Sequence, residues 1–232
     1  GGRTGVGKTH LINDLAGGID LEGVANHLGS AFGRRATPQP PQIGMENDLA
    51  VRLLKHRAGQ GGTVVVEDEG RNIGSREIPL PFFRAMAAAP LVLLERPLEE
   101  RVEIGLQDYV TDPFAEFEAR FGTAEAPERF SAHLLAAVDR IRRRLGGARH
   151  QEVKAQLRQA LAEFFGRGEL DTFRSIIRRL LVEYYDPMYD YQIAKRAERI
   201  RFQGSEAEVR DWLAGPGRAA AWFDPRAMAE RL

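Results

Sequence analysis

The sequence predicts an α/β fold in which a parallel sheet is flanked by helices and carries an inserted all-helical lid. A G-x4-G-K-T pattern occupies residues 2–9, and strand and helix patterns alternate from residue 63 to residue 109. No clear strand pattern occurs from about residue 111 to residue 196. Strands that alternate with helices are typical of parallel sheets, so the helical block is expected to be an insertion into a P-loop NTPase-like core.

The first third of the chain supplies most of the expected core. Residues 9–15 have a helical pattern that Gly17 and Gly18 end, and residues 19–21 are expected to form a short strand. A long loop rich in Gly, Pro and Arg is expected at 26–43. The elements expected after it are helices at 45–56, 81–89 and 97–109, a turn at 59–62, and strands buried on both faces at 63–67 and 91–95.

The chain is expected to divide into four parts. They are a P-loop α/β core at 1–110, a helical lid at 111–198, a last strand and helix returning to the core at 199–214, and a tail at 215–232. A P-loop is typically preceded by a buried strand, so we expect the sequence to be a fragment of a longer chain. The helices expected in the lid lie at 113–121, 127–145, 149–166, 169–184 and 186–198.

Composition excludes several classes of site. The 232 residues include 33 basic and 33 acidic side chains, so any nucleic-acid surface must come from local clustering of charge. There is no cysteine, which excludes disulfides, thiolate metal sites and cysteine nucleophiles within this sequence. No apolar run is long enough to span a membrane, and no signal peptide is recognisable, so a cytoplasmic location is expected.

The G-x4-G-K-T pattern predicts a P-loop, also called a Walker A motif. Its glycines let successive backbone N–H groups surround phosphate oxygens, Lys8 adds a positive charge at the terminal phosphate, and the Thr9 hydroxyl can hold Mg²⁺. A chance glycine-rich turn is the alternative, which the following helix pattern disfavours. The expected phosphate-binding residues of the loop are Gly2, Thr4, Gly5, Val6, Gly7, Lys8 and Thr9.

Acidic residues at the expected strand ends are candidates for metal binding and catalysis. Asp68 and then Glu67 follow the most apolar strand pattern, where P-loop proteins place the carboxylate that serves Mg²⁺. Asp20 and Glu22 follow the expected strand at 19–21 and could act as a base or contact the substrate. Solvated turns are the alternative at both places. We therefore expect Lys8, Asp68 and Asp20 to be catalytic, and Thr9, Asp68 and Glu67 to serve the metal ion.

Arginines and tyrosines suggest further contacts. Arg34, Arg35 and Arg71 could each hold a phosphate bidentately, with surface solvation as the alternative. A basic run at 140–158 could track a nucleic-acid backbone or be an ordinary solvated helix face. The segment at 184–191 holds four tyrosines, which could stack a base, line an apolar pocket or pack the lid. The expected tRNA or prenyl contacts are Arg142, Arg143, Arg149, Tyr185 and Tyr189.

Taken in order, these segments resemble the P-loop domain of the tRNA 2-selenouridine synthase family. The likeness covers nearly the whole sequence up to about residue 214. The P-loop alone is unspecific, but the later segments are far more specific as a set. The resembling segments are GGRTGVGKT (1–9), IDLEGVANHLGSAFGRRATPQPPQ (19–42), VVVEDEGRNIGSREIP (64–79), LVLLERPLEERVE (91–103) and EYYDPMYDYQIAKRAERIRFQG (183–204).

The resemblance implies a transferase that acts on the wobble uridine of tRNA. Enzymes of that family convert 2-thiouridine to 2-selenouridine with selenophosphate, through an S-geranylated intermediate made from geranyl diphosphate. A full-length member carries an N-terminal rhodanese-like domain with a catalytic cysteine, and this sequence has neither that domain nor any cysteine. The selenium step is therefore not assignable to this sequence alone, whereas binding of the diphosphate, with Mg²⁺, and of tRNA is expected. A selenophosphate-supplying enzyme is an expected partner.

In that interpretation the P-loop stabilises the pyrophosphate that leaves the geranyl group. ATP is therefore a possible ligand, but the resemblance favours geranyl diphosphate. An apolar groove is also required for the terpenoid chain, with Phe164, Phe165, Tyr185 and Met188 as candidate wall residues. Two other functions fit the same residues. One is a small-molecule kinase or ATPase with a helical lid, and the other is a non-catalytic module that docks tRNA through its basic run.

Overall fold

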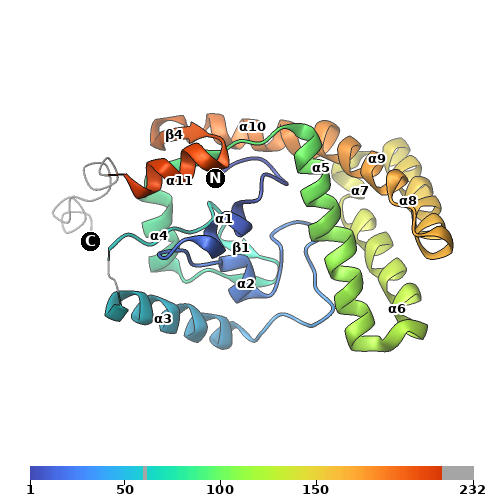
Figure 1. Ribbon diagram of the computed structural model, residues 1–232, viewed down its shortest axis with the longest axis horizontal. Helices are drawn as coiled ribbons and strands as arrows, with labels where there is room; N and C mark the ends of the chain where they lie inside the picture. The colour runs from blue at the N-terminus through green and yellow to red at the C-terminus, as the bar shows by residue number, and fades with distance from the viewer. Residues whose placement is uncertain (60–61, 216–232) are drawn as a thin grey trace.

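The computed structural model describes residues 1–59 and 62–215 and has a mostly helical α/β architecture with a small parallel sheet. The part containing α1, α2 and β1 lies between α3 on one side and α11 and β4 on the other (Figure 1). Helices α5 to α9 pack together beside it (Figure 1). No helix among the described residues is long and apolar enough to cross a membrane.

The elements of the first half are short, apart from one helix. Its helices are α1(Lys8–Asp14), α2(Leu21–Ala25), α3(Gln42–Gly59), α4(Leu80–Ala88) and α5(Leu98–Leu106), and its strands are β1(Asn72–Ile73), β2(Arg76–Glu77) and β3(Leu91–Leu94). The long loop between α2 and α3 and the helices expected near 45–56, 81–89 and 97–109 are confirmed. The β1–β2 hairpin was not predicted. The turn expected at 59–62 lies partly outside the described residues.

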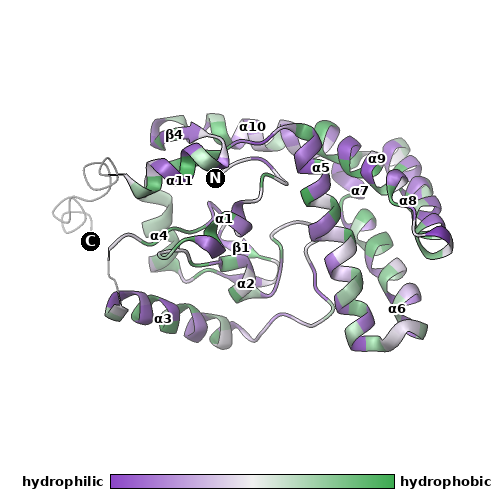
Figure 2. Cartoon of the chain, viewed as in Figure 1, coloured by the Kyte–Doolittle hydropathy of each residue, from purple (hydrophilic) through white to green (hydrophobic). Residues whose placement is uncertain are grey.

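The second half is helical until its last strand. Its elements are the π-helical turn η1(Gln107–Thr111), α6(Asp112–Arg140), α7(Arg142–Leu145), α8(Gly147–Arg167), α9(Asp171–Leu180), the π-helical turn η2(Leu181–Tyr185), α10(Asp186–Ala194), the 3-10 turn η3(Ala197–Arg199), β4(Ile200–Gly204) and α11(Glu206–Ala214). Gly122, with φ of 76°, breaks α6 within its length. Hydrophilic and hydrophobic residues alternate along α3 and α8, as expected for helices with one buried face (Figure 2). The expected tail lies almost entirely outside the described residues.

The parallel sheet joins distant parts of the chain. β3 pairs with β4 in parallel, with Leu94 opposite Gly204, so the prediction that a strand near 199–204 returns to the sheet is confirmed. Gly1 lies along the other edge of β3, because its amine donates to the Val92 carbonyl at 2.7 Å and its carbonyl accepts from Leu94 N–H at 3.0 Å. The start of the predicted P-loop is thereby fixed against the sheet.

Two strand predictions are wrong. Residues 63–67 form no ladder strand: Val65 makes an isolated parallel bridge to Gly18 on one side, and on the other side residues 64–66 line an apolar slot shared with β3. Because only the segment at Gly18 bridges this run, residues 63–66 are only partly buried. Residues 19–21 are not a strand either, because Asp20 caps α2 and Leu21 begins that helix.

Three groups of buried apolar side chains stabilise these parts. The largest lies within the helical half and includes Phe130, Val153 and Leu181. A second joins α2, α3 and the β1–β2 hairpin, and a third joins α1, β3 and α11. Each group packs a helix against a different neighbour, so the loop of residues 1–7 has rigid elements on several sides.

Candidate functional site

The loop of residues 2–7 has the backbone that its glycines allow. Gly5 has φ of 77° and Gly7 has φ of 81°, and a Cβ at Gly5 would lie 2.8 Å from the carbonyl oxygen of Arg101. Gly7 also precedes the first residue of α1. Lys8 Nζ folds back to donate to the carbonyls of Gly2 and Arg3, each at 3.2 Å. A glycine-rich turn, a helix start and a lysine above the loop form the arrangement that suits a phosphate group.

Carboxylates gather beside the start of α1. Thr9 Oγ1 donates to Glu22 Oε2 at 3.1 Å. A Cβ at Gly29 would lie 2.4 Å from Glu22 Oε1 and 3.1 Å from Glu69 Oε2, so these two carboxylates converge where the chain passes at Gly29. Glu67 is 1% exposed, accepts from Leu21 N–H at 3.0 Å and leaves its Oε1 without a partner.

Burial and mutual repulsion change how these carboxylates titrate. Burial, followed by the charges of Glu69 and Glu67, raises the pKa of Glu22 to about 8. Burial also raises the pKa of Glu67 to about 7 and raises the pKa of Glu69. Buried carboxylates with raised pKa values are frequent at functional sites because they exchange protons near neutral pH.

Two predicted site residues have structural partners. Asp68 forms an ion pair with Arg196 and lies 3.7 Å from Arg199. Asp20 caps α2 by accepting from Gly23 N–H at 2.6 Å. Sequence reasoning did not anticipate that these carboxylates would be engaged, because both partners of Asp68 lie more than 120 residues away in sequence.

The predicted metal ligands only partly converge. In the described part of the chain, no three His, Asp or Glu side chains are arranged to hold a metal ion. Thr9 and Glu22 nevertheless bring a hydroxyl and a carboxylate together, and the free Oε1 of Glu67 is a buried acceptor without a donor. Oxygen donors of this kind suit Mg²⁺, which ordinarily keeps waters and substrate phosphates among its ligands. The residues therefore fit an ion that arrives with a diphosphate.

The tyrosine-rich segment lies against the P-loop. Lys8 Nζ is 5.6 Å from the centre of the Tyr189 ring. Arg3 donates to both carboxylate oxygens of Asp190, at 2.7 and 2.8 Å. These contacts bring together two segments that lie about 180 residues apart in sequence, and they place Tyr189 beside the expected phosphate site.

An apolar pocket adjoins the glycine-rich loop of residues 2–7. Thr4 and Gly5 of the loop line it, and the rest of its wall is almost wholly apolar or aromatic. Tyr185 belongs to this wall as predicted, whereas Phe164, Phe165 and Met188 do not. Sequence reasoning missed the remaining wall residues, which are Phe32, Gly105, Tyr109, Val110, Leu134, Val138, Leu157, Phe173, Ile176, Ile177, Leu180 and Leu181.

Two buried tyrosines of this wall, Tyr109 and Tyr185, form hydrogen bonds with Ser30. Burial raises the pKa of Tyr109 well above its usual range and raises that of Tyr185, while a hydrogen bond with Ser30 opposes the shift in both. The Phe32 ring meets the Tyr109 ring edge to face at 6.4 Å between centroids. The glycine-rich loop at 29–33 therefore reaches the cavity through Ser30 and Phe32.

The predicted phosphate arginines outside the P-loop are separated from it. Arg35 forms an ion pair with Glu116 at 2.5 Å, and Arg71 pairs with Glu77 in the hairpin at 2.5 Å. Arg34 is exposed and bridges His27 through its backbone. None of the three forms a hydrogen bond or an ion pair with residues 2–9, so their role as phosphate ligands stays a prediction.

The predicted basic surface lies at α7 and the start of α8. Arg142 and Arg143 are exposed, and neither forms an ion pair with another described residue. Arg149 is also exposed and lies 3.7 Å from Glu183. Two unpaired guanidinium groups on a short helix leave this surface positively charged.

Comparisons with known proteins all point to one protein family. The family model described as "tRNA 2-selenouridine synthase AAA domain" matches residues 1–218. Proteins named tRNA 2-selenouridine synthase are similar: that of Cupriavidus necator is 51% identical over 92% of this chain, and that of Pseudomonas putida F1 is 48% identical over 97%. The protein of that name from Alcanivorax borkumensis is 46% identical over 91% of the chain. The chain spans 58–60% of the length of these curated relatives, and no solved structure matches it.

Proposed function

The chain belongs to the tRNA 2-selenouridine synthase AAA-domain family, and on that premise we propose that it is the P-loop part of an enzyme that modifies tRNA. In the proposed reaction, wobble 2-thiouridine becomes 2-selenouridine through S-geranyl-2-thiouridine. The part played by this chain is to bind geranyl diphosphate and tRNA and to transfer the geranyl group. The enzyme is therefore proposed to be a transferase.

One observation carries the choice of donor. Thr4 and Gly5 belong to the P-loop and also line the apolar cavity. A ligand with a diphosphate at one end and a hydrocarbon chain at the other would use both features at once, and burial of its apolar surface would favour binding. ATP would leave the apolar cavity without a matching group, so geranyl diphosphate is the better fit.

The proposed step is an alkylation of sulfur. The thiocarbonyl sulfur of 2-thiouridine attacks C1 of the geranyl group, a C–S bond forms, and the C1–O bond breaks. The electron pair of that bond leaves on pyrophosphate, and the N3–H proton of the base is released. The backbone N–H groups of the loop and the ammonium of Lys8 would stabilise the charge that develops on the leaving group.

Mg²⁺, when bound, would add positive charge at the leaving diphosphate. Thr9, with Glu22 and Glu67 behind it, is the group of residues proposed to hold it. Glu69, beside Glu22, is the candidate to accept the released proton, because burial raises its pKa and so favours its protonated form. Neither Asp68 nor Asp20 is proposed as the base, since each is engaged in another contact.

Two further parts of the proposal concern the helical lid and the binding partners. The helices from α6 to α10 would act as a lid that covers the donor, and Arg142, Arg143 and Arg149 would contact tRNA. Selenophosphate would replace the geranylthio group in a second step. Because this chain holds no cysteine, we assign that step to a rhodanese-like domain of the longer enzyme. A selenophosphate-supplying enzyme would be the matching partner.

The proposal is tested by titrating geranyl diphosphate, with Mg²⁺, against the wild type and Lys8→Ala. Loss of a charge-assisted contact to the diphosphate should weaken binding at least about tenfold. Lys55→Ala, on the exposed face of α3, is the matched control and should bind as the wild type does. Equal affinity of the wild type and Lys8→Ala would overturn the proposal.

A further inference from the structure

Thr4 lies where the loop of residues 2–7 meets the apolar pocket. Thr4 and Gly5 line that pocket, whereas the other residues of the loop do not. Arg101 fixes the backbone at this point: its Nε donates to the Thr4 carbonyl at 2.9 Å, and its own carbonyl oxygen would lie 2.8 Å from a Cβ at Gly5. The Thr4 side chain is therefore attached to a well-held backbone at the junction of loop and pocket.

The hydroxyl of Thr4 is buried and has no partner. The residue is 8% exposed, and its Oγ1 makes no hydrogen bond. The other buried hydroxyls of the wall belong to Tyr109 and Tyr185, which form hydrogen bonds with Ser30. Among the lining residues that the structure describes, Thr4 therefore holds the unpaired side-chain oxygen. Leaving a buried hydroxyl unpaired is costly, and a hydrogen bond to a ligand would remove that cost.

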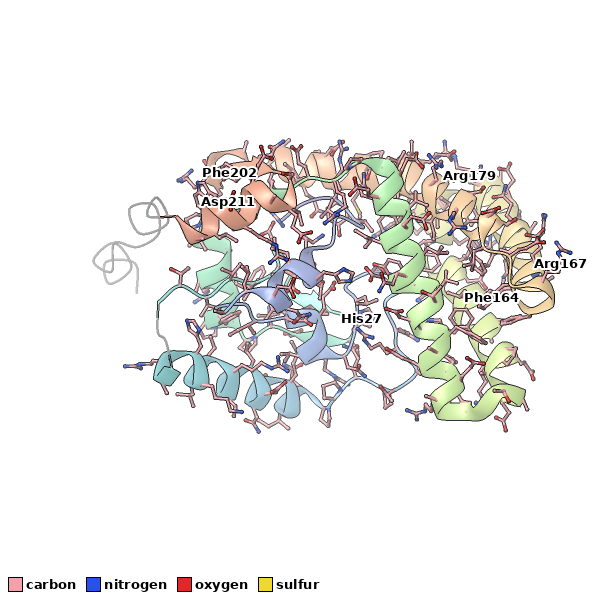
Figure 3. All side chains as sticks on the ribbon, in the orientation of Figure 1. His27, Phe164, Arg167, Arg179, Phe202 and Asp211 are labelled. Carbon is pink, nitrogen blue, oxygen red and sulfur yellow. The ribbon has the colours of Figure 1, made fainter. Side chains whose placement is uncertain are left out.

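The pocket lies between two parts of the molecule. Its wall comes from Thr4, Gly5 and Phe32 of the first part and from the helices of the second half. His27, at the start of the loop that carries Phe32, lies between the part with α1 and α2 and those helices (Figure 3). A ligand that occupies both the loop and the pocket would therefore pass Thr4 at this boundary.

We propose that the Thr4 hydroxyl donates a hydrogen bond to the oxygen that joins the diphosphate to C1 of the geranyl group. The inference rests on the proposed function, in which the loop holds the diphosphate and the pocket holds the hydrocarbon chain. The joining oxygen is the ligand atom between those two parts, and Thr4 belongs to both the loop and the pocket. The backbone N–H groups of the loop and Lys8 are left for the other phosphate oxygens.

This hydrogen bond becomes stronger as the reaction proceeds. When the C1–O bond breaks, its electron pair passes to the joining oxygen, which changes from a weak ester acceptor into an anionic one. A hydrogen bond to a charged acceptor is stronger than one to a neutral acceptor, so the Thr4 hydroxyl stabilises the transition state more than the bound donor. Its removal therefore lowers kcat more than it raises KM.

The test compares Thr4→Val, which keeps the shape of the side chain without the hydroxyl, with Thr4→Ser, which keeps the hydroxyl. The measurement is steady-state transfer of the geranyl group from geranyl diphosphate to a tRNA that carries 2-thiouridine, with Mg²⁺ present. Thr4→Val should lower kcat by about tenfold to a hundredfold and change the KM for geranyl diphosphate by less than about threefold. Thr4→Ser should keep kcat within about threefold of the wild type.

The stability of the ligand-free protein separates this role from a structural one. Because Thr4 Oγ1 has no partner, Thr4→Val should unfold in urea at the wild-type midpoint or above it. A lower midpoint in Thr4→Val would give the hydroxyl a structural role and overturn the inference. Thr123→Val, at an exposed threonine of α6, is the matched control and should leave both kcat and the midpoint unchanged.

The kinetic outcomes separate this inference from the proposed function. A wild type that transfers no geranyl group would overturn both. Transfer by the wild type with an equal kcat in Thr4→Val would overturn the inference alone. A loss confined to KM would do the same, because it would indicate a contact made equally in the bound donor and in the transition state. A loss of kcat in Thr4→Ser as large as that in Thr4→Val would also overturn it, because serine retains the hydroxyl.

Discussion

Arg101 and Asp186 form a bidentate ion pair that joins α5 to the first turn of α10. Arg101 Nη1 and Nη2 lie 3.0 and 2.5 Å from the two carboxylate oxygens, and the arginine side chain is 3% exposed. Its Nε donates to the carbonyl of Thr4 at 2.9 Å. One guanidinium group therefore holds the P-loop and the tyrosine-rich segment together.

Removing this guanidinium is expected to destabilise the chain. Arg101→Gln removes the bidentate partner of the largely buried Asp186 and leaves it only Arg3 at 4.0 Å, which should lower the free energy of unfolding by about 3 kcal/mol. Urea titration measures the change. Glu103→Gln breaks the exposed pair with Arg174 and should cost less than about 1 kcal/mol. If Arg101→Gln lowered the free energy of unfolding as little as Glu103→Gln does, the buried pair would not organise the loop of residues 2–7.

Narrowing the apolar cavity is expected to affect only ligands with a hydrocarbon chain. Gly105 lines the cavity, and a Cβ there would lie 3.0 Å from Ile177 Cγ2. Gly105→Ala should weaken geranyl diphosphate binding by about fivefold or more through this crowding and leave pyrophosphate binding unchanged. Calorimetric titration with both ligands makes the comparison. Gly166→Ala in α8, where a Cβ meets nothing within 4 Å, is the control.

The pH dependence of stability should reveal the buried carboxylate Glu22. Its pKa is raised from 4.5 to about 8, so the folded state retains a proton that the unfolded state releases. Its contribution to stability is complete below pH 4.5 and is lost as the pH rises through about 8. Relative to Glu22→Gln, the wild type should therefore lose stability progressively between pH 4.5 and about pH 8.

The comparison with Glu22→Gln is needed because other groups titrate in the same range. Glu67, with its pKa raised to about 7, acts in the same direction. The buried amine of Gly1, with its pKa lowered from 8.0 to about 5, acts in the opposite direction. Urea unfolding at a series of pH values gives the difference curve. A difference in stability between the wild type and Glu22→Gln that does not change with pH would show that Glu22 titrates normally. Mg²⁺ should make this difference depend less on pH if the ion favours the ionised carboxylates.

Contacts with tRNA should depend on the exposed arginines of α7. The double variant Arg142→Gln and Arg143→Gln should bind tRNA more weakly and reduce the salt dependence of its binding constant by about one to two ions, because each lost phosphate contact releases about one counterion fewer. Filter binding over a range of salt concentrations measures both quantities. Replacement of the exposed Arg57 and Arg84 is the control, and an equal effect there would indicate nonspecific attraction.

Local patterns predict the glycine-rich turn at residues 2–7, the helix start after it and most of the helices. The spacing of Gly2, Gly7 and Lys8 already requires a tight turn and a helix start, and both are present. Asp20 was misread as a strand end, although an Asp before a short apolar helix is an ordinary cap signal. The run at 63–67 has strand character, but a ladder also needs a neighbouring segment that stays in register over several residues, which no local pattern shows.

The candidate site depends mostly on contacts between distant residues. Lys8 meets Tyr189, and Arg101 meets Asp186, across more than 80 residues in each case. The sequence predicts Tyr185 and Tyr189 as tRNA or prenyl contacts, but it could not tell that Tyr189 lies beside Lys8. The wall of the apolar pocket comes from Thr4, Gly5, Phe32 and several helices, so no single segment carries its pattern.

The central claim is that the P-loop and the apolar cavity bind one ligand together. It is tested most directly by titrating the wild type, with Mg²⁺, against geranyl diphosphate, pyrophosphate and ATP under identical conditions. Burial of the hydrocarbon chain in the cavity predicts that geranyl diphosphate binds at least about a hundredfold more tightly than pyrophosphate, and more tightly than ATP. Equal affinities for geranyl diphosphate and pyrophosphate, or tighter binding of ATP, would contradict the account.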